Sequence, residues 1–333
     1  MEVAAGSGGS SKKPASRRDQ LMQQLPGYAG MIRLNGQTLP HAYVSLNRPT
    51  GKYVHRALLK IASVLLDRGG VRTVGHPGAP GMTLPLLDAD RGFAQIPIWP
   101  KGYSAVAVNV LGHPSIREAV TVPAEPFMLL DLDPTWHSIE DYLAAMKTKY
   151  RTRARRVQTL SAHCSLTECT DWPDADWLDW AGELLGKTLA DKAVALPDDL
   201  RGLLATFKRV YGADFHVLGY QSKGQWVGFI TALQEGDCLF AMHMGFEPEF
   251  TREAHFYQRS MMDVVDLGIR LRATGVNMGR TATEIKSSLG AKPQANSYVF
   301  IANCSWMRWL VSGYLRWFHR LPAYEVRSPF RES

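Results

Sequence analysis

The sequence has few cysteines and no long apolar run, and both absences narrow the classes of protein that it can belong to. Its four cysteines, at 164, 169, 238 and 304, form no Cys-x-x-Cys pair. Zinc needs four converging ligands at tighter spacing than His163, Cys164 and Cys169 offer, so we expect no metal and free thiols in a reducing compartment. No stretch reaches the ~20 apolar residues of a membrane-spanning helix.

Other signatures are missing as well. Residues 1–20 are mainly Gly, Ser, Ala, Lys and Arg without an apolar segment, so we predict a disordered tail over residues 1–25 and no secretion signal. The segment 75–81 (GHPGAPG) lacks the Lys-Ser/Thr pair of a P-loop and is interpreted as a turn. No serine or cysteine near the candidate site has a histidine at a spacing that suggests a nucleophile, so we expect no acyl-enzyme.

The composition is that of a globular protein with a basic surface. The 333 residues are 45% hydrophobic and 21% charged, and the net charge is +7. The length suits one large or two moderate domains. The positive charge favours acidic partners such as phosphate groups, RNA or an anionic membrane. We expect a cytoplasmic protein, with the inner membrane face as a peripheral location.

The order of apolar runs and turns predicts a mixed α/β fold. Residues 27–120 alternate short apolar runs with Gly and Pro turns around one helix, from about Tyr53 to Asp67. Beyond residue 160 the expected order is strand, two helices, three strands, helix, strand, helix and strand. The main segments are Phe127–Leu132 before this region and, within it, Ser165–Cys169, Trp177–Thr188, Asp198–Tyr211, Phe215–Gln221, Trp226–Gln234, Cys238–Gly245, Glu253–Arg272 and Tyr298–Ile301.

A basic segment lies between the two halves. A capping box at 138–141 opens a helix that continues into six cations. One interpretation is a solvated helix end whose charges complement the helix dipole. The other is an anion-binding patch for donor phosphates, RNA or a lipid surface. The cations are Lys147, Lys149, Arg151, Arg153, Arg155 and Arg156.

Residues 306–321 predict an amphipathic helix. Three tryptophans with flanking arginines are typical of a helix at a membrane interface. Docking of the helix on the protein core or on a second subunit is the alternative, since either would cover its apolar face. That face comprises Met307, Leu310, Val311, Tyr314, Trp317, Phe318 and Leu321.

The segment Val276–Pro293 (VNMGRTATEIKSSLGAKP) holds the densest set of candidate site residues. A short apolar run precedes a turn at Gly279, a helix starting at Thr281 or Thr283, and a stop at Gly290. A strand leading into a polar helix N-terminus can form an anion site, because unpaired N–H groups and the helix dipole point outward. A solvated surface turn is the alternative.

Three motifs, in this order and spacing, carry a family resemblance. They are Asp141–Arg156 (a helix with a basic tail), His255–Val265 (HFYQRSMMDVV), and Gly-Arg-Thr-Ala-x-Glu-Ile-Lys-Ser-x-x-Gly-Ala-x-Pro at 279–293. Together they resemble the GNAT-like N-acyltransferase superfamily, in particular the Fem-type transferases of peptidoglycan biosynthesis. The resemblance implies tandem GNAT-like lobes of the acyl-CoA N-acyltransferase fold. It divides the chain into an N-terminal lobe over 26–135, a basic connecting helix over 136–160, a C-terminal GNAT lobe over 161–303, and an amphipathic helix and tail over 304–333.

In that fold two central strands part and the donor carbonyl bonds to strand backbone, which places the site where Cys238–Gly245 meets Val276–Arg280. A base is expected at His243, whose imidazole has a near-neutral pKa, and an acid for the leaving group at Tyr257. Glu247 and Glu249 are alternative bases or partners of the substrate ammonium. Packing in the core is the alternative for His243 and Tyr257. The residues expected to bind donor or substrate are Arg280, Thr281, Glu284, Lys286, Ser287, Lys149, Arg151 and Arg153.

The sequence therefore predicts an N-acyltransferase. It would move an acyl group, with a fatty acyl group as one candidate, from a thioester to a primary amine of a peptide, amino acid or cell-envelope precursor. Residues 245–254 (GFEPEFTREA) lack the glycine pair of a CoA pyrophosphate loop and carry three carboxylates, which disfavours ordinary CoA binding. We expect no permanent cofactor, with acyl-CoA or an acyl-carrier protein as donor. The alternatives are a Fem-type transferase that uses aminoacyl-tRNA and a non-catalytic module that binds RNA or membrane.

Overall fold

A computed structural model describes most of the chain. The described ranges are 16–34, 37–45, 70–79, 81–82, 104–113, 119–169, 171–172, 175–189, 199–249, 255–302, 305–318, 321 and 323–331. The helix predicted between Tyr53 and Asp67 lies outside them, as do residues 250–254 of the acidic loop.

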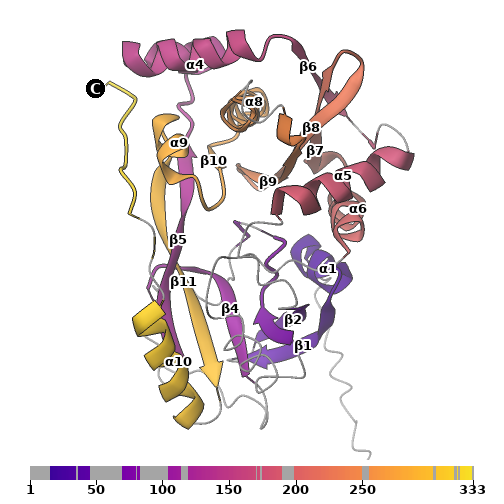
Figure 1. The fold of residues 1–333 in the computed structure, drawn as a ribbon, viewed down its shortest axis with the longest axis vertical. Helices are drawn as coiled ribbons and strands as arrows, with labels where there is room; N and C mark the ends of the chain where they lie inside the picture. The colour runs from indigo at the N-terminus through magenta and orange to yellow at the C-terminus, as the bar shows by residue number, and fades with distance from the viewer. Residues whose placement is uncertain are drawn as a thin grey trace, which may run out of the picture.

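One mixed sheet runs through the described residues (Figure 1). Its eleven strands follow the order β1-β2-β3-β4-β11-β5-β10-β9-β8-β7-β6. The pairs β3–β4 and β9–β10 are parallel, and the others are antiparallel. This confirms the mixed α/β class. The strands are β1 (Tyr28–Leu34), β2 (Gln37–Ser45), β3 (Gly70–Val74), β4 (Ser104–Leu111), β5 (Ala119–Asp131), β6 (Cys164–Cys169), β7 (Phe215–Ser222), β8 (Gln225–Glu235), β9 (Cys238–Phe246), β10 (Gly275–Asn277) and β11 (Lys292–Ala302).

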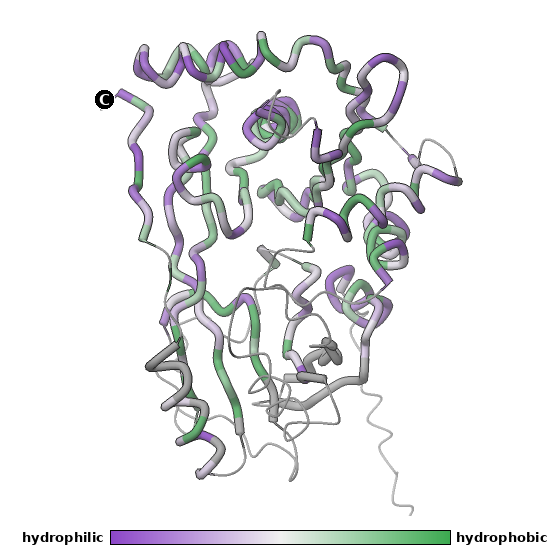
Figure 2. The backbone as a smooth tube through the Cα atoms, in the orientation of Figure 1, coloured by the Kyte–Doolittle hydropathy of each residue, from purple (hydrophilic) through white to green (hydrophobic). Residues whose placement is uncertain are grey.

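Helices cover both faces of the central strands, so side chains on both faces are buried. In β7, Phe215 and Val217 point into one apolar core and Leu218 and Tyr220 into the other, as the two-residue period of a strand requires. Figure 2 shows apolar residues gathered in these strands and polar residues along α4. The helices are α1 (Arg17–Gln24), α3 (Ile139–Ala145), α4 (Thr148–Leu160), α5 (Ala175–Leu189), α6 (Leu200–Tyr211), α8 (Phe256–Arg270), α9 (Thr283–Ser288) and α10 (Ser305–Phe318).

Helix α1 lies within the segment 1–25 that the sequence predicts to be disordered, so that prediction is wrong for residues 16–25, and residues 1–15 lie outside the described ranges. Ser16 and Asp19 form a reciprocal capping box at its start, with the Ser16 hydroxyl accepting from the Asp19 N–H at 3.1 Å. Leu21, Met22 and Leu25 are buried in the same core as α5 and α6. These three apolar side chains anchor a segment whose other residues are mostly polar.

The basic segment forms two helices, where the sequence predicts one. Helix α3 begins at the predicted capping box and ends at Ala145, and the backbone of the following residue, Met146, is extended. Met146 forms an isolated antiparallel β-bridge with Phe330. The N–H of Lys147 donates to the carbonyl of Pro329 at 2.8 Å. Arg151 donates to the carbonyls of Ala144 and Met146 and so satisfies the end of α3. The C-terminal segment 323–331 therefore fixes the break between the helices.

Candidate active site

Two neighbouring parallel strands part near the centre of the sheet. β10 pairs with β9 only as far as Asn277, which lies opposite Phe240, although β9 continues to Phe246. Beyond Asn277 the chain stays with β5: the Met278 N–H donates to the Met128 carbonyl at 2.8 Å, and the Met128 N–H donates to the Gly279 carbonyl at 3.1 Å. The described residues therefore contain no strand that pairs with β9 on its β10 side past Phe240.

An elbow over residues 278–282 follows the parting strands. The side-chain carbonyl of Asn277 accepts from the Gly279 N–H at 2.9 Å, which closes the turn. Gly279, Thr281 and Ala282 all have positive φ, of 72°, 65° and 49°. For the two non-glycine residues this conformation costs on the order of 1 kcal/mol each. Helix α9 then starts at Thr283, the second of the two predicted starting points, and is six residues long.

The Arg280 side chain packs between two aromatic rings. Its guanidinium carbon lies 5.9 Å from the ring centre of Phe127 and 5.8 Å from that of Tyr298, and it donates to the Tyr298 hydroxyl at 2.8 Å. Cation–π contacts at this range add about 0.5–1 kcal/mol each. The structure therefore holds the half-buried Arg280 in one orientation at the elbow.

The predicted donor-binding residues on α9 mostly stabilise the elbow itself. The Lys286 side chain is fully buried, and its ammonium donates to the Arg280 carbonyl at 2.5 Å. Ser287 donates to the Glu284 carbonyl at 3.0 Å. The Glu284 carboxylate lies 3.2 Å from the guanidinium of Arg327 in the C-terminal segment. No contact with a donor has to be invoked to account for these three side chains.

Tyr257, in the first turn of α8, lies against the elbow. Burial raises the pKa of its phenol above the ordinary value, and a hydrogen bond with Thr281 opposes that shift. The phenol is therefore protonated near neutral pH. The structure thus brings Tyr257, from the motif at 255–265, into contact with Thr281, from the motif at 279–293.

His243 lies in the interior, on the side of the sheet that α6 covers. A β-bulge places Met242 and His243 opposite the single residue Thr231, and this turns the imidazole toward Phe207, at 5.1 Å between ring centres. Nε2 lies 2.7 Å from the Gly78 carbonyl, and Nδ1 lies 3.4 Å from the Thr231 hydroxyl. Nε2 must carry the proton, since a carbonyl only accepts.

Burial also lowers the pKa of His243, to about 4, so the ring is neutral at pH 7. Both ring nitrogens have protein partners. These contacts fit the packing alternative for His243 better than the role of a base.

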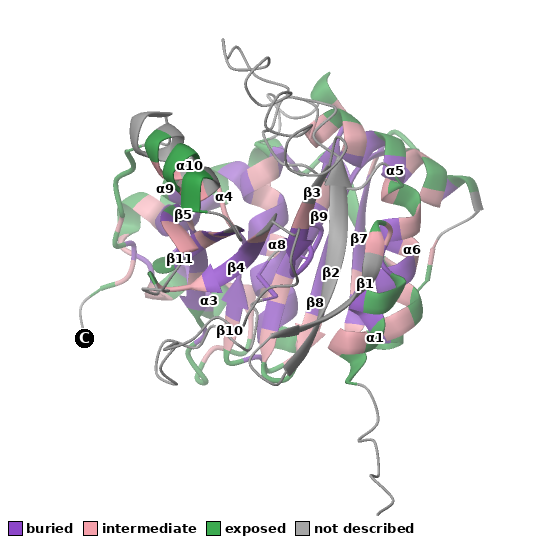
Figure 3. Cartoon of the chain, turned by 90° about the horizontal axis from the view of Figure 1, so that it is seen from below, coloured by how far each residue is buried: buried purple, intermediate pink, exposed green. Residues whose placement is uncertain are grey.

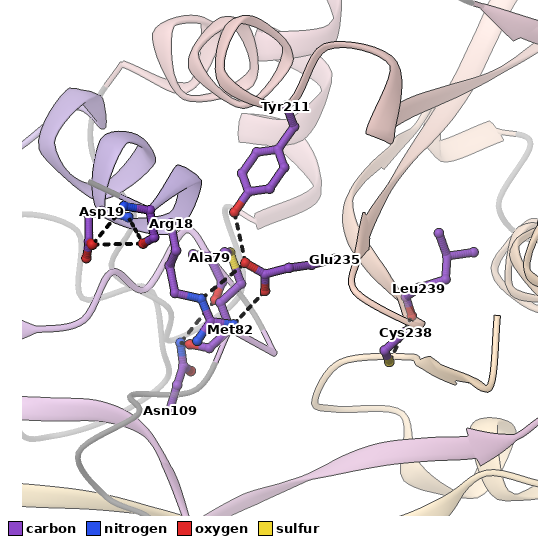
Figure 4. Close-up of polar contacts among 10 residues, drawn as sticks. Arg18, Asp19, Ala79, Met82, Asn109, Tyr211, Glu235, Cys238 and Leu239 are labelled. Carbon is purple, nitrogen blue, oxygen red and sulfur yellow. Dashed lines mark hydrogen bonds and ion pairs between the residues drawn. The ribbon is translucent and has the colours of Figure 1, made fainter. Parts of the chain in front are cut away.

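The glycine-rich loop 75–82 approaches the point where the strands part. A Cβ on Gly81 (φ +81°) would lie 2.9 Å from Phe240 and 3.0 Å from the Asn277 amide. The Asn109 amide donates to the carbonyls of Ala79 at 3.1 Å and Met82 at 3.4 Å, as Figure 4 shows. The turn interpretation of this loop is confirmed, but its place beside β9 and β10 and the role of Asn109 are not signalled in the sequence.

The remaining predicted residues pair with other elements or face solvent. Glu247 follows β9, and its carboxylate is 3.8 Å from the Lys187 ammonium on α5. Lys149 and Arg153 are exposed on α4, along the outer edge of the molecule (Figure 1). Arg151 contributes to the end of α3, as described above.

Neither a metal centre nor a membrane span is found in the described ranges. No group of three or more His, Cys, Asp or Glu side chains there is arranged to bind a metal ion. No helix in that part of the chain has both the length and the hydropathy to cross a bilayer.

No protein-family model and no curated protein matches this sequence. Solved structures similar to it include the C-terminal domain of a protein described as a lysylphosphatidylglycerol synthetase from Agrobacterium fabrum, with 12% identity, 90% of this chain and 92% of the other covered, and a TM-score of 0.49. FemX has 12% identity, coverage of 88% and 92%, and a TM-score of 0.45. A tandem GNAT protein from the clavulanic acid pathway has 12% identity, coverage of 83% and 83%, and a TM-score of 0.40. GNAT and Fem-type proteins are thus among the solved structures that are similar to this chain.

Proposed function

We propose that the protein is a GNAT-like N-acyltransferase whose active site lies between β9 and the elbow. The observation that carries the proposal is the parting of the parallel strands β9 and β10 after Phe240 and Asn277. Backbone groups of β9 beyond that point can hold a donor carbonyl in a fixed orientation. Preorganised donors of this kind stabilise the oxyanion that forms when an amine attacks a carbonyl.

Tyr257 assists the leaving group in this proposal. The amine nitrogen attacks the thioester carbonyl, and the C–S bond of the tetrahedral intermediate breaks while the phenol donates a hydrogen bond to the leaving sulfur. Burial keeps the phenol protonated at neutral pH, so this hydrogen bond is available, and the thiolate then leaves as the anion or takes a proton from solvent. The proton lost by the amine goes to solvent or to Glu247, whose carboxylate is partly exposed beyond the end of β9. His243 serves to hold loop 75–82 against the sheet.

For the donor we propose acyl-CoA or an acyl-carrier protein, and for the acceptor a primary amine of a peptide, an amino acid or a cell-envelope precursor. Arg280 and Thr281 would contact the donor at the elbow. Helix α4 has five cations and no carboxylate, and its exposed Lys149 and Arg153 suit the phosphates of the donor. The same charge favours a second candidate, Fem-type transfer from aminoacyl-tRNA, because a tRNA presents phosphates over a longer surface.

Mass spectrometry tests both candidates. The protein is incubated with acyl-CoAs or aminoacyl-tRNAs and with primary amines, and new amide products are measured. Amide formation from a thioester that ribonuclease does not affect supports the leading proposal, whereas ribonuclease-sensitive transfer supports the second. Arg201→Ala, which removes an exposed ion pair on α6, serves as the control for Arg280→Ala. Absence of transfer from every donor would leave a non-catalytic binding module as the better account.

A further inference from the structure

Helix α10 presents an apolar face to solvent. Trp306, Trp309 and Leu310 are 54%, 75% and 49% exposed, and their spacing places them on one side of the helix. Another side of α10 packs on β11 and β5. Figure 3 shows exposed residues along the outer side of this helix. Docking on the sheet therefore accounts for only part of the apolar surface of α10.

The sequence in and around this helix carries charge of one sign. Residues 303–324 contain Arg308, Arg316 and Arg320 and no Asp or Glu, and the whole chain carries a net charge of +7. Apolar side chains flanked by arginines, without carboxylates, match a surface that combines negative charge with an accessible apolar layer. An anionic lipid bilayer has both properties.

Two-fold pairing with a second copy of the chain fits this surface less well. A symmetric dimer brings the same patch of each protomer together, so two surfaces of the same sign of charge would face each other. Like charges at a desolvated contact oppose association. Tryptophan, in contrast, is enriched at the headgroup level of bilayers, where its ring is buried and its N–H stays hydrated.

We propose that α10 docks the protein peripherally on bilayers with anionic headgroups, through Trp306 and Trp309 and with arginines at the headgroups. This surface is distinct from the basic helix α4, which lies at the opposite end of the molecule (Figure 1). The proposal does not rest on acyl transfer, because binding to vesicles can be measured without donor or acceptor.

Flotation with vesicles of phosphatidylcholine, with or without phosphatidylglycerol, tests the proposal. We expect binding that needs phosphatidylglycerol and weakens at high salt, since exposed charges are screened. Trp306→Ser with Trp309→Ser should weaken binding by about tenfold or more. Lys149→Ser with Arg153→Ser, on α4, is the matched control and should bind within about twofold of wild type. Both double variants replace exposed side chains, so circular dichroism should show unchanged folding.

Four results would overturn the proposal. One is equal binding to vesicles with and without phosphatidylglycerol, and another is loss of binding in the α4 variant alone. The third is a dimer in light scattering that the Trp306→Ser, Trp309→Ser variant abolishes, which would assign the face to a second copy. Failure to bind vesicles with acyl transfer intact would remove the docking surface and leave the active-site proposal standing.

Discussion

The imidazole Nε2 of His243 lies 2.7 Å from the carbonyl oxygen of Gly78, across 165 positions of sequence. This contact joins loop 75–82 of the N-terminal half to β9, close to the point where β9 and β10 part. The ring can donate to that carbonyl and accept from Thr231 only in its neutral form. The position of the loop is therefore coupled to the protonation state of one buried histidine.

Mild acid should weaken the fold through this histidine. Between pH 6.5 and about 4 the unfolded chain binds a proton at residue 243 and the folded chain does not, so the free energy of unfolding falls as the pH falls through this window. The loss approaches about 3 kcal/mol over the whole window. Urea denaturation at a series of pH values measures it.

The control for this prediction is His243→Gln, which keeps a donor near the Nε2 position but does not titrate. Its unfolding free energy should depend less steeply on pH, with the difference amounting to about one proton. Some dependence should remain, because burial also lowers the pKa of His76. Identical slopes in wild type and His243→Gln would contradict the assignment.

Replacing Gly81 should weaken the packing of loop 75–82 against β9 and β10 and so lower the stability of the fold. Ala at this position has a φ of +81° and a Cβ within 3.0 Å of Phe240 and Asn277. Gly112→Ala is the matched control, because its φ is +70° and nothing lies within 4 Å of its added Cβ. Each variant loses about 1 kcal/mol from the backbone conformation. Gly81→Ala should lose a further 1–3 kcal/mol, on the order of an overpacked core, in thermal denaturation.

Arg280→Ala should reduce turnover far more than stability. The lost ring contacts and hydrogen bond amount to about 2 kcal/mol in unfolding experiments. The loss of a positioned donor contact is expected to cost about 100-fold or more in kcat/KM. Tyr298→Phe removes only the hydrogen bond of Arg280 and should keep activity within about threefold of wild type. Activity of Arg280→Ala equal to that of wild type would remove Arg280 from the site.

The C-terminal segment should stabilise α9 through Phe330. Its ring centre lies 5.5 Å from that of Trp136 and 5.8 Å from that of Tyr142, and its edge fills the space beside Gly290. Phe330→Ala should lower the free energy of unfolding by about 2–4 kcal/mol. Tyr324→Ala, at a side chain that is 40% exposed, should change it by less than about 1 kcal/mol. Equal effects of the two substitutions on the denaturation midpoint would contradict this role.

The sequence predicts much of the second half of the fold because its signals there are local. The capping box at Ser138 and the glycine stop at Gly290 act through neighbouring residues, and the structure has both. The break at Met146 could not be predicted, since its cause is pairing with Phe330, nearly two hundred residues away. Helix α1 was missed for a similar reason, because its apolar residues are stabilised by α5 and α6.

The candidate site likewise contains residues that local motifs predict and residues whose roles depend on contacts between distant parts of the chain. Arg280, Thr281 and Tyr257 were predicted from motifs, and in the structure Tyr257 forms a hydrogen bond with Thr281, next to Arg280 in the sequence. Lys286 has the residue type of a ligand-binding cation, yet its ammonium bonds the backbone of Arg280. The part played by Asn109 and loop 75–82 depends on how the two halves meet. No local sequence pattern predicts the contact between the two halves of the chain.

Hydrogen–deuterium exchange tests the central claim most directly, using a non-hydrolysable analogue of whichever donor supports transfer. The account predicts that the analogue slows exchange at the amides of residues 241–246 of β9 and 278–282 of the elbow. Exchange in β7, which lies farther from the parting strands, should not change. Slowed exchange elsewhere in the molecule, with no change in these two segments, would contradict the proposal that the parted strands hold the donor.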